Sequence, residues 1–283
     1  MNTNLLVALA TIVKNPIKKL TSYYSYSNRI NSAGEALEFY IKDVFCNSLS
    51  VDNIPEKNKI YNNYFSYIGN QNNPPDLMIK QGDALEVKKL EGFGSGLALN
   101  SSYPKNKLYV DSPMITTACR NCENWNVKDL IYSVGIVRQS ALKSLWFIYG
   151  DCYAADRKVY ERIRDKVAEG VNSLPDIEFS ETRELGRVNK VDPLGITYLR
   201  IRGMWHIESP FRVFSYIAPV NFSVTFSLVA ILLGEKYLSF PEKDRKAFEY
   251  LKEKGLVIKD IEIKSPDNPA KLLKAKLATY EKQ

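Results

Sequence analysis

Two carboxylates and an amine stand at strand spacing between residues 75 and 88, where the chain reads Pro-Asp-Leu-Met-Ile-Lys-Gln-Gly-Asp-Ala-Leu-Glu-Val-Lys. The stretch Gln81-Gly82-Asp83 predicts a tight turn, so the residues on either side are expected to form a β-hairpin. Because side chains alternate between the faces of a strand, Asp76, Glu86 and Lys88 then share one face. Two carboxylates on one face can hold a divalent cation, and a lysine beside them can reach a water molecule or a phosphate.

A three-residue loop also predicts which residues of this hairpin lie opposite each other. The expected pairs are Lys80 with Ala84, Met78 with Glu86, and Asp76 with Lys88. The opposite face carries only apolar side chains, Leu77, Ile79, Leu85 and Val87, and should pack on a core. The non-catalytic alternative is a salt-bridged hairpin with a solvated face, because charged outer faces are ordinary in antiparallel sheets.

The composition is that of a large globular protein with a basic surface. The chain has 283 residues, of which 45% are apolar and 25% charged, and its net charge of +7 favours a polyanionic partner. No basic segment precedes the apolar N-terminal residues 4–10, and the apolar stretch 220–233 is too short and too polar to span a bilayer. We therefore expect a cytoplasmic protein with no membrane partner.

The four cysteines leave one question open. Cys119 and Cys122 form a single CxxC pair, and zinc would need Cys46, Cys152 or the lone His206 to join them in space. Reduced, unliganded thiols are the expectation, with zinc as the alternative.

The segments around the hairpin predict the elements that position it. Leu37, Ile41 and Phe45 recur every four residues, so a helix is expected from Ser32 to Phe45, with Glu35 at the capping-box position. Glu38 lies on the flank of its apolar stripe. Residues 3–28 are expected to be helical with a break at Pro16, and a strand is expected within residues 59–68.

Further along, helices are expected over 127–138, capped by Asn126, and over 157–171, capped by Asp156. The apolar run 144–150 between them predicts a central strand that is covered on both faces. Together these elements predict an α/β fold, a mixed β-sheet flanked by helices. Residues 216–283, with the apolar stretch and a helix at 241–254, are expected to provide support or a subunit interface.

Two segments carry groups that suit nucleic acid. Gly92 to Gly96 is a glycine run without the Lys-Ser/Thr ending of a phosphate-binding loop, but amides, hydroxyls and a cation follow it. Residues 197–202 alternate like a strand, which places two arginines on one face with few acids close by, and arginine can bind guanine with two hydrogen bonds. The alternative is a solvated sheet face. The DNA-binding candidates are Asn100, Ser101, Ser102, Lys105, Arg187, Lys190, Arg200 and Arg202.

These patterns together resemble a known family. The segments that carry the resemblance are Gly34 to Glu38, Pro75-Asp76, Glu86-Val87-Lys88, Asn100 to Lys105, Lys128 to Tyr132, and Asp192 to Arg202. Over roughly residues 30 to 210 the chain resembles type II restriction endonucleases of the NgoPII kind, in the PD-(D/E)xK nuclease superfamily.

The resemblance implies a restriction-endonuclease-like core with a C-terminal elaboration. The expected organisation is a single endonuclease domain over 1–283, with the catalytic core at about 30–172 and a DNA-recognition and support region at about 173–283. Asp76, Glu86 and Lys88 would be catalytic, and Glu38 or Glu35 would complete the metal site. The resemblance further implies Mg²⁺, a homodimer, double-stranded DNA cut at a short GC-rich palindrome, and a cognate methyltransferase that protects host DNA.

Two other functions remain open at this point. One is a structure-specific or repair nuclease with the same core, and the other is a catalytically silent DNA-binding protein. Retention of Asp76, Glu86 and Lys88 argues against the silent protein.

Overall fold

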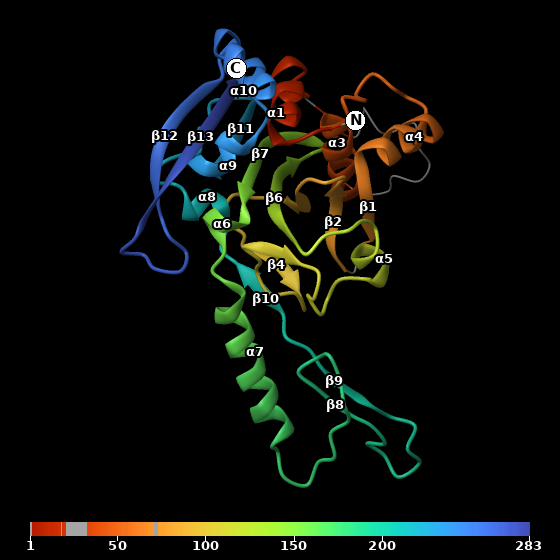
Figure 1. Cartoon of the computed structure of the whole chain (residues 1–283). Coiled ribbons are helices and arrows are strands. Elements are labelled where there is room, and N and C mark those ends of the chain that lie inside the picture. The colour runs from red at the N-terminus through yellow and green to blue at the C-terminus, as the bar shows by residue number, and fades with distance from the viewer. Residues whose placement is uncertain (1, 18, 21–32, 71–72) are drawn as a thin grey trace.

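A computed structural model gives the fold and describes residues 2–17, 19–20, 33–70 and 73–283 (Figure 1). The strands of its main sheet are β1 (Phe65–Asn70), β2 (Asn73–Ile79), β3 (Ala84–Leu90), β5 (Lys107–Tyr109), β6 (Val127–Arg138), β7 (Ala141–Tyr149), β11 (Phe226–Leu233), β12 (Val257–Lys264) and β13 (Leu272–Lys282). Within the described residues these strands form one sheet in the order β1-β2-β3-β6-β7-β11-β13-β12, with β5 paired to β6. The β3–β6 and β7–β11 pairs are parallel and the other neighbours antiparallel, so the predicted mixed α/β fold is confirmed.

Helices cover this sheet. They are α1 (Leu5–Lys14), α3 (Ala33–Cys46), α4 (Ile54–Tyr64), α5 (Thr117–Arg120), α6 (Gly150–Tyr153), α8 (Pro210–Val213), α9 (Gly234–Ser239), α10 (Glu242–Glu249) and the 3₁₀ turn η1 (Tyr250–Lys254). α3 packs on β3 and β6, and the approach is close, since a Cβ at Gly135 of β6 would lie 2.7 Å from the end of the Leu37 side chain of α3, which would have to shift. The helix that carries Glu38 is thereby held against the strand that carries Glu86.

One predicted helix is wrong. Residues 127–138 form strand β6, in the centre of the sheet between β3 and β7. Residues 130–137 of this strand are all buried, because both faces of the sheet are covered here. A strand buried on both faces is apolar throughout and shows no two-residue alternation, so its apolar residues also fit a helical spacing.

Other predicted elements are confirmed with changed limits. The helix ending at Phe45 is α3, the central strand at 144–150 is β7, and the C-terminal helix 241–254 is α10 followed by η1. The N-terminal helix spans Leu5–Lys14 and ends at its cap Asn15, in agreement with the break expected at Pro16, while residues 18 and 21–28 of that prediction and the cap Ser32 lie outside the described part. Most of the strand predicted at 59–68 is helical, because Asn53 caps α4 by accepting a hydrogen bond from Glu56, and the strand begins only at Phe65.

An arm projects from this body. It consists of α7 (Arg157–Asn172), as predicted with Asp156 as its cap, and of a ribbon formed by β8 (Gly186–Val188) and β9 (Leu199–Ile201). Figure 1 shows α7 and the ribbon extending together away from the sheet, beyond the small pair of β4 (Leu97–Asn100) and β10 (Trp205–Ile207). α7 has no buried residue, so the arm lacks a core of its own. We call residues 157–204 the arm.

Among the helices that the structure describes, none is both long and apolar enough to cross a bilayer.

Candidate active site

The hairpin of β2 and β3 forms, but with a different register from the predicted one. Met78 lies opposite Ala84 rather than Glu86, and Leu77 lies opposite Leu85. The amide of Ile79 donates to the carbonyl of Asp83 at 2.9 Å, so the three-residue loop is 80–82, one residue earlier than expected. The pairing therefore differs from the predicted one by two residues, and a two-residue change leaves the division into two faces intact. The predicted pairs are wrong, while the shared face is found.

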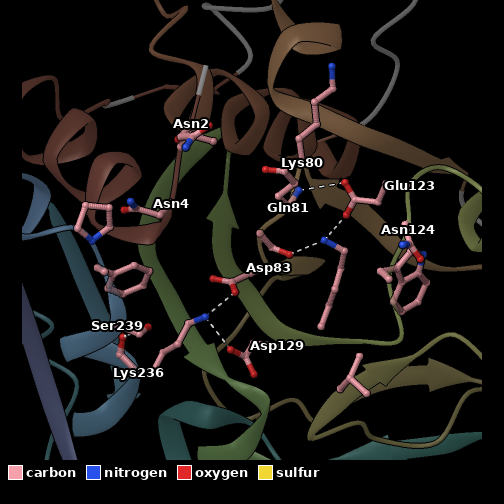
Figure 2. A pocket seen from close by; sticks show the side chains of 17 residues that line it. Asn2, Asn4, Lys80, Gln81, Asp83, Glu123, Asn124, Asp129, Lys236 and Ser239 are labelled. Carbon is pink, nitrogen blue, oxygen red and sulfur yellow. Dashed lines mark hydrogen bonds and ion pairs between the residues drawn. The ribbon is translucent and has the colours of Figure 1, made fainter.

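Contacts from distant segments set this register. The amide of Gln81, which has a left-handed φ of 53°, donates to Glu123 at 3.0 Å (Figure 2). The ammonium of Lys128, on β6, donates to the carbonyl of Gly82 at 2.6 Å and to that of Ile79 at 3.2 Å. The turn therefore takes its geometry from residues about forty positions away, which the local sequence cannot indicate.

At the other end of the hairpin, the acidic and basic side chains contact one another and the backbone. The Nζ of Lys88 lies 2.7 Å from Oε1 of Glu86, and Oδ2 of Asp76 accepts a hydrogen bond from the amide of Val87 at 2.6 Å. The second oxygen of Glu86, Oε2, is buried and has no hydrogen-bond partner among the described residues. A buried carboxylate oxygen without a partner is costly, so this atom marks a place where a ligand would be stabilised.

The charges of this cluster shift the acidity of its members. Burial, and next the carboxylate of Glu86, raise the pKa of Asp76 well above its usual range, while Lys88 and the Val87 amide lower it less. Burial lowers the pKa of Lys88, but the carboxylates of Glu86 and Asp76 outweigh it and raise the pKa overall. Lys88 is therefore held as an ammonium, and the positive charge near Asp76 does not offset the cost of burying its carboxylate.

Glu38 stands beside this cluster on α3. Burial, followed by the opposing effect of Lys42, dominates its acidity, and its pKa is raised overall. Glu86 and Lys88 are among the charges that act on it, so it lies within electrostatic reach of the hairpin. The charge of Glu35 also raises the pKa of Glu38, so Glu35 lies within electrostatic reach of Glu38.

Lys42 is a residue that the sequence analysis missed. It is buried on α3, one turn after Glu38, and its Nζ lies 3.9 Å from the ring centre of Phe39. Burial lowers its pKa, whereas the carboxylates of Glu38, Asp43 and Asp76 raise it. The four-residue spacing of Glu38 and Lys42 was the signal that could have indicated it.

A cleft of about 1180 Å³ connects the hairpin to the arm. Asp76, Glu86 and Lys88 line it from β2 and β3, and the predicted DNA-binding residues Asn100, Ser101, Ser102, Arg187, Arg200 and Arg202 line it from β4, the loop that follows β4, and the arm. Thr116, Thr117 and Arg120, around α5, complete the wall and were not predicted. The structure thus brings most of the candidate DNA-binding residues to the same cavity as the candidate catalytic ones.

Two predicted DNA-binding residues lie elsewhere. Lys105 is buried, contacts the hydroxyl of Ser102 and donates to the carbonyl of Tyr103 at 3.2 Å, and burial lowers its pKa to about 8. Its backbone is held inside because its amide donates to the hydroxyl of Tyr132 at 2.7 Å. Lys190 is exposed on the arm but does not line the cleft, and its side chain packs beside Gly195.

The expectation that few acids lie near the arginines of the arm is wrong. Glu184 accepts hydrogen bonds from Nε and Nη2 of Arg200, at 2.9 and 2.7 Å, and from Nε of Arg202 at 2.5 Å. Glu184 is distant in sequence and meets the arginines only because the chain folds back as the β8–β9 ribbon. Arg187, opposite Arg200 in this ribbon, lies 5.4 Å from the ring centre of Tyr198.

The cysteines are free thiols. Sγ of Cys119 lies 3.3 Å from the sulfur of Met78, and Sγ of Cys122 lies 3.9 Å from it. Across residues 2–17, 19–20, 33–70 and 73–283, no three or more His, Cys, Asp or Glu side chains lie close enough to share a metal ion. This finding covers Cys119 and Cys122, and it also covers the group of Glu38, Asp76 and Glu86.

A second cavity, of about 560 Å³, lies at the turn end of the hairpin (Figure 2). Lys236, from α9, lies 2.6 Å from both Asp83 and Asp129, and the hydroxyl of Tyr149 donates to Asp83 at 2.6 Å. The charges in this cavity neutralise one another, unlike those beside Asp76. The second cavity therefore joins α9 to the hairpin rather than adding to the cleft.

Comparison with known proteins agrees with this arrangement. The model of the family described as NgoPII restriction endonuclease matches residues 3–264. The chain is 46% identical over 280 residues to the type II restriction enzyme NgoPII of Neisseria gonorrhoeae, covering 98% of this chain and 99% of that protein. No solved structure matches the chain. The chain therefore belongs to the NgoPII restriction endonuclease family.

Proposed function

We propose that this type II restriction endonuclease hydrolyses the phosphodiesters of double-stranded DNA with Asp76, Glu86 and Lys88, and that Mg²⁺ is its cofactor. The observation that carries the proposal is the cleft itself, which holds these three side chains at one end and the arginines of the arm at the other. One cavity thus offers a site for the reacting phosphate and a site for base recognition.

The residues present fit Mg²⁺. This cation is held in proteins by one or two carboxylates and otherwise by water and phosphate oxygens, so the pair of Asp76 and Glu86 is a sufficient donor set. The unpartnered Oε2 of Glu86 and the raised pKa of Asp76 both indicate a site that lacks positive charge. When bound there, Mg²⁺ would polarise the phosphate and lower the pKa of a water molecule. Glu38 is the proposed third carboxylate, because its charge already acts on Asp76.

Lys88 is proposed to act on the attacking water and on the phosphate. Its raised pKa keeps the ammonium charged, so it can donate hydrogen bonds and offset the negative charge that develops on the phosphate. Glu86 holds the ammonium at 2.7 Å and thereby fixes its position before DNA binds.

The recognition site is proposed to be a short GC-rich palindrome. Arginines are the main cations of the cleft wall, and arginine pairs with two acceptors on the guanine edge. Asn100, Ser101 and Ser102 lie in the same wall and can bind phosphates or base edges. We propose that the chain is a single endonuclease domain. Its catalytic core is formed by about residues 30–172, and about residues 173–283 provide DNA recognition and support.

A homodimer is proposed as the active species, because each chain carries one catalytic cluster and a palindrome presents two equivalent strands. The arm supports this proposal. Its loop 189–198 exposes Leu194 at 82% and Ile196 at 77%, and we propose that these side chains contact a second copy of the chain. A methyltransferase that modifies the same DNA sequence is the proposed partner in the cell.

Digestion of a plasmid tests the catalytic assignment. The wild-type protein should cut at one fixed sequence with Mg²⁺ and not with EDTA, and sequencing of the ends identifies the site. Asp76→Ala and Lys88→Ala should lower cutting by several orders of magnitude while binding to the same DNA survives. A folded Asp76→Ala protein that cuts at the normal rate would contradict the assignment.

The same digestion separates the alternatives. A structure-specific or repair nuclease would leave an intact plain duplex uncut or would cut it without a fixed sequence. A silent DNA-binding protein would bind the duplex and cut nothing under any metal condition.

A further inference from the structure

Glu184 occupies an unusual position for an acid in a protein that binds DNA. Its carboxylate lines the cleft beside the arginines, and only 14% of its side chain is exposed. A negative charge there opposes the approach of phosphates. Its presence therefore calls for a role that outweighs this repulsion.

The hydrogen bonds of Glu184 treat the two arginines differently. Arg200 gives both Nε and Nη2 to the two oxygens of the carboxylate, which is a bidentate pair. Arg202 gives only Nε. Within the described part of the chain, the terminal nitrogens Nη1 and Nη2 of Arg202 donate to no protein group. In Arg200, only Nη1 has no protein acceptor.

This difference decides which arginine can recognise guanine. The contact needs two N–H donors side by side, one for N7 and one for O6. Arg202 can present its two terminal nitrogens without breaking any contact of the free protein. Arg200 could do so only by giving up part of its bidentate pair with Glu184.

Glu184 also keeps two cations close together. Arg200 lies on β9 and Arg202 directly follows it, and both guanidinium groups contact the same carboxylate oxygen, so they lie near enough to repel each other. The shared carboxylate neutralises one of these charges and fixes both side chains before DNA arrives. Hydrogen bonds from Arg200, and next from Arg202, lower the pKa of Glu184, so the carboxylate stays ionised.

We infer that Glu184 is a specificity-determining positioning residue, which holds Arg200 as a support and presents Arg202 to the edge of a guanine. The inference rests on the proposed function, because it assumes that the cleft binds a specific duplex. Arg202 is then the arginine that reads the base, and Glu184 and Arg200 act through it.

The test compares binding to the site found by plasmid digestion and to the same duplex with one G·C pair changed. All variants are made in the Asp76→Asn background, so that the DNA is not cut. Arg202→Lys keeps the charge and loses the paired donors, so it should bind unrelated DNA as before and lose about tenfold to a hundredfold of its discrimination at one G·C pair.

Glu184→Gln should change two quantities in opposite directions. Discrimination at that same pair should fall, because Arg202 is no longer fixed. Binding to unrelated DNA should become tighter, because a negative charge has left the cleft. A purely structural role would not produce this opposite pair of changes, and Glu184→Asp should restore part of the discrimination.

Glu181→Gln is the matched control. Glu181 lines the same cleft, so its removal should tighten non-specific binding and leave discrimination unchanged. If Glu184→Gln behaves like this control, the inference is wrong. It is also wrong if Arg200→Ala loses more discrimination than Arg202→Ala at every G·C pair of the site.

The failure of this inference is distinct from the failure of the proposed function. A wild-type protein that cuts no duplex at a fixed sequence overturns the function. A wild-type protein that cuts at a fixed sequence, with Glu184→Gln indistinguishable from Glu181→Gln, overturns only the role of Glu184.

Discussion

At the scale of single residues, the cluster of Asp76, Glu86 and Lys88, which we propose to be catalytic, includes a buried carboxyl that lowers the stability of the metal-free protein. The pKa of Asp76 is raised by burial and by Glu86, so the folded state holds its proton more tightly than the unfolded chain does. Stability must then fall as the pH rises from about 4, the value for an unfolded aspartate, through the higher pKa of the folded state. At neutral pH and without metal, the buried carboxyl of Asp76 therefore lowers the stability of the protein.

Asp76→Asn should therefore stabilise the metal-free protein. The amide keeps an oxygen for the Val87 amide and removes the charge, and a gain of about 1 kcal/mol would raise Tm by about 2–4 °C. Thermal unfolding in EDTA should show a larger difference between variant and wild type at pH 8 than at pH 5. Added Mg²⁺ should stabilise the wild type alone and reduce the difference. A variant that melts below the wild type at pH 8 would refute this account.

Residue-level prediction from the sequence succeeded where only strand periodicity mattered. Asp76, Glu86 and Lys88 line one cleft although the strand pairing differs from the predicted one, because it differs by two residues, which is the period of side-chain alternation. The register itself depends on Glu123 and Lys128, and the partner of Arg200 depends on the folding back of the ribbon. Such contacts between distant segments cannot be predicted from a local sequence pattern.

At the scale of elements, the main sheet is a platform that C-terminal segments complete. β11 lies beside β7, and α9 follows it and reaches back to the hairpin turn. The sequence predicted α3 and α7 from caps and helical periodicity, and β7 from its continuous apolar run. It mistook β6 for a helix because the apolar residues of this doubly covered strand also fit a helical spacing. Lys236 is the residue through which α9 and the hairpin are joined (Figure 2).

Lys236→Met should lower the free energy of unfolding. The substitution leaves Asp83 buried without its cation, and breaking a buried ion pair in this way costs about 3–5 kcal/mol. Lys80→Met is the control, since Lys80 lines the same cavity but is exposed and should change stability by less than about 0.5 kcal/mol. Urea unfolding at pH 7 measures both, and equal stabilities of the two variants would remove Lys236 from this role.

The effect of Lys236 should also depend on pH. Burial raises the pKa of Asp129, but hydrogen bonds from Lys107 and Lys236 outweigh it and lower the pKa overall. A lowered folded pKa contributes stability above about 4, the unfolded value, and this contribution is lost as the pH falls through the folded pKa. The difference between wild type and Lys236→Met should therefore be full at pH 7 and shrink below about pH 4.

At the scale of the whole molecule, the arm is the feature that the monomer does not explain. α7 buries no residue, and the ribbon beside it carries the arginines on one side and exposed apolar side chains in the loop 189–198. A projecting segment without a core is stabilised when another surface covers it, and in the homodimer that we propose the second chain would do so. The arm would then connect recognition to the pairing of two active sites.

Leu194→Asp combined with Ile196→Asp should separate these two functions. Sedimentation of the wild type on a duplex with the site should give two chains for each duplex, and the double variant should give one. Because a single active site reaches one strand, the variant should nick plasmid DNA and form linear product much more slowly. Val257→Asp, on the edge strand β12 where Val257 is 44% exposed, is the control and should leave the dimer intact. One chain per site with a concerted cut of both strands would exclude the homodimer, whereas a variant that still dimerises would place the interface outside the arm.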